Sequence, residues 1–150
     1  MGPSVKRDLV LSREYQPTRY PRIAVIDLDP KIQFSEYVEA ELLRKGYQVR
    51  EGFIVRQTLK NEAPNDKPID PDTLAKIGNL LDVQGIVLCS VLEFSRFRDA
   101  YRLNMKMVSP KDGFTLWSAQ GYLEGKKGQK TADLLREIVG ASLKGLPPVP

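Results

Sequence analysis

The run GIVLCSVLEF, residues 85–94, constrains the fold more than any other part of this chain. Apolar side chains occupy both alternating sets of positions, with Ile86, Leu88, Leu92 and Phe94 on one set and Val87, Cys89 and Val91 on the other. A strand that is apolar on both sides is typical of a sheet interior with further layers packed on each face. The run therefore predicts a central strand and a layered fold that combines helices with strands.

The residues before this run alternate between strand and helix patterns. Residues 22–29, RIAVIDLD, form a β-branched run that predicts a first, interior strand. Residues 34–45 are expected as a helix because apolar side chains recur there every four positions, and Gly46 is well placed to end it. Residues 47–53 indicate a short strand, and residues 54–61 a short helix or turn.

Capping residues mark the start of a further helix. Asp70 is a side-chain cap, Pro71 suits the first helical position, and Asp72 favours the positive helix end. Leu74, Ile77 and Leu81 then give this helix one apolar face.

An antiparallel hairpin is predicted after the central strand. Apolar and polar residues alternate over residues 101–107, and SPKDG supplies a turn in which Gly113 is expected at positive φ. Residues 114–122, FTLWSAQGY, return as the partner strand. A final helix is expected over residues 131–144, after the spacer GKKGQK.

This order predicts an α/β (α+β) fold. One mixed sheet with a C-terminal antiparallel hairpin is expected to pack against three or four helices. Residues 1–21 are expected as an extended arm, residues 22–145 as a single globular domain, and residues 146–150 as a tail.

Composition excludes several kinds of catalytic site. The 150 residues contain no histidine, so neither a Ser-His nor a Cys-His pair can form. The lone cysteine, Cys89, permits no internal disulfide and is expected to be a buried structural thiol. No run approaches the ~18 apolar residues of a membrane-spanning helix. We therefore expect no enzyme, no catalytic residue, no cofactor and no metal site.

Two phrases of the sequence resemble the curli-secretion-lipoprotein-like superfamily. The phrase DPDTLAKIGNLLDVQGIVLCSVLEF resembles that group's helix, short turn and central strand. The phrase VSPKDGFTLWSAQG resembles its hairpin, with matches at Val108, Gly113, Leu116, Trp117, Ser118 and Gly121. Ser109 stands where the group usually has an acid, and Asp112 where it often has threonine. The strand at residues 22–29 also agrees with the group's first strand.

The resemblance implies a bacterial envelope domain that works through protein contacts rather than catalysis. The superfamily includes a curli export channel subunit, an outer-membrane lipoprotein that activates a penicillin-binding protein, and the amino-terminal domain of the Tol translocation protein. It implies a periplasmic, outer-membrane-associated location and a lipid anchor. The opening MGPS is typical of a vector remnant, so no native export or lipidation signal can be read from it. The chain lacks the long insertions of a curli-type pore and the tether of the synthase activator.

Residues 93–102, EFSRFRDAYR, are the strongest candidate for a partner-binding site. Cations alternate with rings where a strand leaves the core, as at protein-interface hot spots and in single-stranded nucleic-acid grooves. The candidate anchors are Arg96, Phe97, Arg98, Tyr101 and Arg102, with Phe53 and Arg56 as a second choice. The alternative is a solvated loop with its rings tucked back.

Other notable residues are more simply explained by structure. Trp117 is expected to be a packing residue rather than a stacking platform. Asp27 and Asp29 suit a turn and a helix entry better than an acid pair, and GKKGQK lacks the spacing of a phosphate loop. Met105 and Met107 are expected in the core.

Together with the absence of a catalytic pattern, the resemblance implies a non-enzymatic envelope interaction module, derived from a lipoprotein, that acts in assembly or secretion. Its expected partner is another envelope protein or a second copy of the chain, with membrane contact only through a lipid anchor. A nucleic-acid-binding domain using the same arginines and an activator of a peptidoglycan synthase are the alternatives. A carboxylate enzyme centred on Asp27 and Asp29 is a third, which requires a concave pocket with shifted acid pKa values.

Overall fold

Strand β4 (Gly85–Ser95) lies inside the sheet, as its apolar pattern predicts. The computed structural model describes residues 4–64 and 69–150, and in these residues six strands form one sheet in the order β1-β6-β5-β4-β2-β3. Strand β4 pairs in parallel with β2 (Arg22–Asp27) and antiparallel with β5 (Ala100–Val108). The sheet is therefore mixed, which confirms the predicted α+β class.

The other elements follow the predicted order from residue 22 onward. The remaining strands are β1 (Lys6–Leu11), β3 (Gln48–Val49) and β6 (Thr115–Glu124). The helices are α1 (Ser35–Arg44), α2 (Gly52–Glu62), α3 (Pro71–Leu81) and α4 (Thr131–Leu143). A short 3-10 helix covers Pro17–Arg19. The segment expected as a short helix or turn is thus a full helix, α2.

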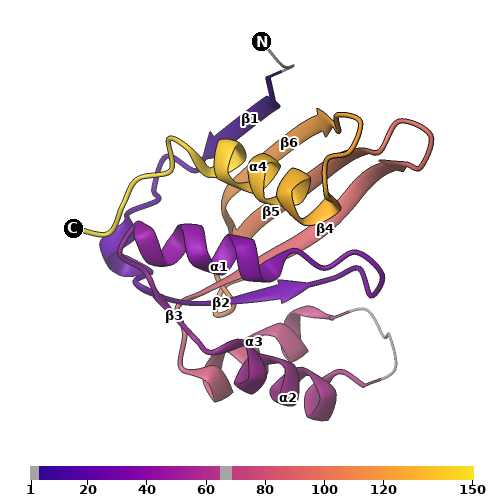
Figure 1. The fold of residues 1–150 in the computed structure, drawn as a ribbon. Helices are drawn as coiled ribbons and strands as arrows, with labels where there is room; N and C mark the ends of the chain where they lie inside the picture. The colour runs from indigo at the N-terminus through magenta and orange to yellow at the C-terminus, as the bar shows by residue number, and fades with distance from the viewer. Residues whose placement is uncertain (1–3, 65–68) are drawn as a thin grey trace.

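Helices cover the two faces of the sheet unequally (Figure 1). Helices α1 and α4 pack over one face, where a large core cluster includes Phe34, Trp117 and Ile138. Helices α2 and α3 pack on the opposite face beside β2 and β4, around a smaller cluster that includes Ile77 and Ile86. The outer face of β1, β6 and β5 carries polar, partly exposed side chains, as is common for antiparallel strands.

Local chemistry sets the ends of these elements. Asp70 caps α3 by accepting a hydrogen bond from Thr73 N at 2.7 Å. Gly46 (φ 92°) follows α1 and Gly113 (φ 79°) lies in the β5–β6 turn, so both occupy the left-handed region that favours glycine. The predicted cap and both predicted glycine positions are confirmed.

Both chain ends contact the body of the fold. Strand β1, which falls within the arm expected over residues 1–21, pairs antiparallel with β6. The guanidinium of Arg7 donates to the carbonyl oxygen of Ala141 in α4 at 2.8 Å. In the expected tail, Leu146 is buried and Val149 N donates to the carbonyl oxygen of Lys45 at 2.8 Å. We propose that the folded unit runs from β1 through residue 149 rather than from residue 22 to residue 145.

Candidate functional site

The β4–β5 turn projects beyond the body of the molecule (Figure 1). Ser95 pairs with Ala100 across the hairpin, and the four residues between them form the turn. Arg98 N donates to the hydroxyl oxygen of Ser95 at 3.4 Å, and Asp99 closes the turn at φ 48°. Phe97 is fully exposed (105%), and the arginines on either side of it in sequence are exposed as well.

A second basic loop lies against this turn. Gly125 N, just after β6, donates to the carbonyl oxygen of Asp99 at 2.9 Å. This bond brings the loop between β6 and α4 to the same end of the sheet. Together the two loops form what we call the basic tip, which consists of Arg96, Phe97, Arg98, Lys126, Lys127 and Lys130. Among the ion pairs within the described residues, none involves the five cations of the basic tip.

Two of the five candidate anchors lie on strand β5 rather than in the turn, and both contact other residues of the sheet. Tyr101 is buried (5% exposed), and its ring lies 5.0 Å from that of Phe94. Arg102 donates to a carboxylate oxygen of Glu93 at 3.1 Å and lies 4.9 Å from the ring centre of Tyr122. Tyr101 points to the core because it shares the face of β5 that carries Leu103, Met105 and Met107. The basic tip therefore retains Arg96, Phe97 and Arg98 as its accessible anchors.

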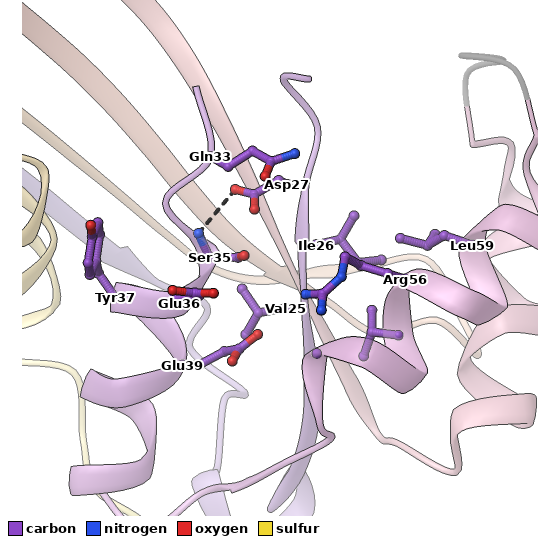
Figure 2. A pocket seen from close by; sticks show the side chains of 12 residues that line it. Val25, Ile26, Asp27, Gln33, Ser35, Glu36, Tyr37, Glu39, Arg56 and Leu59 are labelled. Carbon is purple, nitrogen blue, oxygen red and sulfur yellow. Dashed lines mark hydrogen bonds between the residues drawn. The ribbon is translucent and has the colours of Figure 1, made fainter. Parts of the chain in front are cut away.

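A separate pocket of about 250 Å³ lies between α1 and α2, at the carboxyl end of β2 (Figure 2). Asp27 from β2, Glu39 from α1 and Arg56 from α2 line it. Burial raises the pKa of Glu39, and the negative charge of Glu36 raises it further, while Arg56 opposes the change. Phe53, the other second-choice anchor, is exposed on α2 and is not part of this lining.

The two aspartates near this pocket have structural roles. One carboxylate oxygen of Asp27 accepts hydrogen bonds from Phe34 N at 3.0 Å and Ser35 N at 3.1 Å, at the start of α1. Asp29 accepts hydrogen bonds from Lys31 N at 2.8 Å and Ile32 N at 3.2 Å. The expected turn and helix entry are confirmed. Asp27 lines the pocket but Asp29 does not, so the pocket does not bring these two acids together.

Trp117 is a core residue. Its side chain is 1% exposed and lies in the cluster beneath α1 and α4, which confirms the structural interpretation. Met105, Met107 and Cys89 are buried in the same cluster. Within residues 4–64 and 69–150, no set of three or more Cys, Asp and Glu side chains is arranged to hold a metal ion. Of the helices in these ranges, none is long and apolar enough to cross a membrane.

Comparison with known proteins identifies the fold. No protein-family model matches the chain, and no curated protein matches its sequence. Among solved structures, the PelC dodecamer from Paraburkholderia phytofirmans is similar with a TM-score of 0.58 and 12% identity, covering 97% of this chain and 99% of that one. Lipoprotein GNA1162 from Neisseria meningitidis has a TM-score of 0.60 and 18% identity, covering 84% and 96%. The LpoB C-terminal domain from Salmonella enterica has a TM-score of 0.52 and 12% identity, covering 72% and 85%.

The chain shares its fold with these three solved structures. Identities of 12% to 18% support this likeness at the level of the fold alone. The residues that carried the resemblance have clear structural roles, because Trp117 fills the core and Gly121 permits α4 to approach β6 closely. The lysines of the basic tip were not predicted as part of the site, since the bond from Gly125 to Asp99 has no local sequence signal.

Proposed function

We propose that this domain is a non-enzymatic interaction module of the bacterial envelope, periplasmic and associated with the outer membrane. It would act in the assembly or secretion of an envelope structure, with the basic tip as its contact surface. The observation that carries the proposal is the basic tip itself. Its five cations make no ion pair within the described residues, and Phe97 is fully exposed on a hairpin that stands clear of the body.

The structural neighbours support this location. One of them is a lipoprotein, and another is the C-terminal domain of LpoB. The pocket beside Glu39 supports a non-enzymatic role, because the Asp27 carboxylate there already accepts two backbone hydrogen bonds and the chain contains no histidine. A general acid-base pair needs two groups free to exchange protons with a substrate.

A second candidate is self-association. PelC, which shares the fold, is a dodecamer. In this chain, strand β1 lies at the edge of the sheet and most of its side chains are exposed. An exposed edge strand presents backbone groups that can pair with another chain. Self-association through β1 would leave the basic tip available to a different partner.

A crosslinking experiment tests the proposal. The domain is added to an isolated bacterial envelope fraction, crosslinked, solubilised in detergent and recovered, with Arg98→Glu as the matched variant. We expect one envelope protein to be enriched with the wild-type domain and largely lost with Arg98→Glu. Enrichment of nucleic acid that is removed by salt would contradict the proposal and favour the alternative class. Recovery of the domain alone as a crosslinked ladder would favour the homo-oligomer.

A further inference from the structure

We propose that the basic tip, in addition to contacting an envelope protein, binds a membrane surface with anionic phospholipid headgroups, and that Phe97 enters the boundary between headgroups and acyl chains. This inference rests on the proposed envelope function and names the chemistry of the surface that the tip contacts. The contact would supplement a lipid anchor rather than replace it.

The charge of the tip favours an anionic surface. Five cations from two loops, residues 96–98 and 126–130, meet at one end of the sheet. Of the nearby acids, Glu93 pairs with Arg102 and Asp133 with Arg136. Asp99 and Glu124, which lie in or beside the two loops, reduce the positive charge of the tip but leave an excess of cations. Clustered lysines and arginines bind anionic lipids, with a gain for each cation near the surface.

The position of the Phe97 ring among cations favours a bilayer over a second protein surface. Protein interfaces are enriched in arginine but depleted in lysine, and their hot spots are surrounded by near-neutral contacts. Phe97 instead has an arginine on each side in sequence, and the lysines lie on the adjoining loop. An apolar ring surrounded by cations suits the membrane interface, where the ring meets acyl chains and the cations meet phosphates. Nucleic-acid grooves stack several bases on several rings. Here the ring of Phe97 is fully exposed, whereas the next exposed ring, Phe94, packs against Tyr101.

The topology points the tip toward a membrane anchor. Lys6, the first residue of β1, lies opposite Tyr122 of β6, and Tyr122 lies opposite Arg102 of β5. Residues preceding β1 therefore leave the sheet at the end that carries the basic tip. Figure 1 shows the start of β1 and the β4–β5 turn along the same side of the molecule. A lipid attached ahead of β1, which the resemblance in sequence implies, would hold this end against the bilayer.

Vesicle co-sedimentation of the unlipidated 150-residue chain tests the inference. Vesicles of phosphatidylglycerol mixed with phosphatidylcholine are compared with vesicles of phosphatidylcholine alone. We expect binding to the anionic vesicles only, with a loss that is steep in salt. Phe97→Ala should weaken binding about tenfold through lost apolar burial. Arg96→Glu and Arg98→Glu should each weaken it by about fivefold or more.

The opposite end of the sheet supplies matched controls. Phe114, 71% exposed, and Lys111 lie in or beside the β5–β6 turn, far from the tip along both strands. Phe114→Ala and Lys111→Glu should leave vesicle binding unchanged. In Phe97→Trp, emission from the new indole should be quenched by lipids brominated on their acyl chains, while buried Trp117 provides a constant background.

Several outcomes would overturn the inference. The inference would be wrong if the chain bound neutral and anionic vesicles equally. It would also be wrong if the tip variants and the control variants lost vesicle binding to the same extent. If the chain does not bind vesicles but captures an envelope protein through Arg98, the inference of a lipid partner is wrong and the proposed function is still supported. A chain that binds anionic vesicles through Phe97 but captures no envelope protein would support the lipid partner and count against the proposed function.

Discussion

Gly121→Ala should destabilise the fold, because α4 crosses β6 at this residue. A Cβ atom at this position would lie 2.0 Å from the Ser142 hydroxyl oxygen and 2.9 Å from a methyl carbon of Ile138. The hydroxyl of Ser142 is buried and donates to the Ile138 carbonyl oxygen at 2.6 Å, so moving it away also weakens a hydrogen bond.

Three contributions set the change in the free energy of unfolding, of which two destabilise the fold and the third partly offsets them. Overpacking costs about 1–3 kcal/mol, and a weakened buried hydrogen bond adds about 1 kcal/mol. Reduced freedom of the unfolded chain returns about 0.4–1 kcal/mol. The net loss should be about 1–3.6 kcal/mol, which for this chain length lowers the melting temperature by roughly 2–14 °C.

Urea unfolding and calorimetry of four proteins provide the assay: wild type, Gly121→Ala, Ser142→Ala and the double variant. Removing the Ser142 hydroxyl eliminates the shortest contact, so the two substitutions together should cost about 1 kcal/mol less than the sum of the single costs. If Gly121→Ala is neutral, or if the two costs simply add, the proposed close contact between α4 and β6 is wrong.

Three further predictions concern single side chains. Trp117→Ala should cost about 3–5 kcal/mol because the ring is buried, whereas Phe114→Ala, as an exposed ring, should change stability by no more than about 0.5 kcal/mol; similar costs for both would refute the core assignment. Arg98→Glu should leave the melting temperature nearly unchanged, and a large decrease would make Arg98 a structural residue. Burial raises the pKa of Glu39 in the folded state above its unfolded-state value. The fold therefore loses stability as the pH rises from the unfolded-state pKa through the folded-state pKa, because the buried carboxyl must then ionise. Glu39→Gln should therefore melt higher than wild type at neutral pH and equally at acidic pH, and a lower melting temperature at neutral pH would contradict this.

Sequence patterns were sufficient to predict the central elements of the fold. Strand β4 and helix α3 were predictable because apolar spacing and the Asp70-Pro71 start are local signals. Helix α2 was ambiguous, since its cap comes from Glu51, whose carboxylate accepts hydrogen bonds from Phe53 N and Ile54 N. Strand β1 was harder to predict from the sequence. Its edge position leaves most of its side chains exposed, so apolar and polar residues do not alternate along it.

The candidate site was predictable only in part. The exposed cations and ring at residues 96–98 follow from a polar turn between two apolar strands. Tyr101 could not be placed from composition, because strand alternation directs its ring to the core although Arg102 follows it in sequence. The lysines at 126–130 join the site through one backbone bond between distant loops, and such a bond depends on the completed sheet.

The pairing of β1 with β6 also determines the order in which the fold can form during synthesis. Strand β1 leaves the ribosome first, yet its partner β6 and the α4 carbonyl that accepts from Arg7 are made near the end of the chain. Pairings between such distant segments form slowly, because the intervening chain must first be ordered. The β1 edge of the sheet therefore stays unpaired until β6 and the last helix have been made.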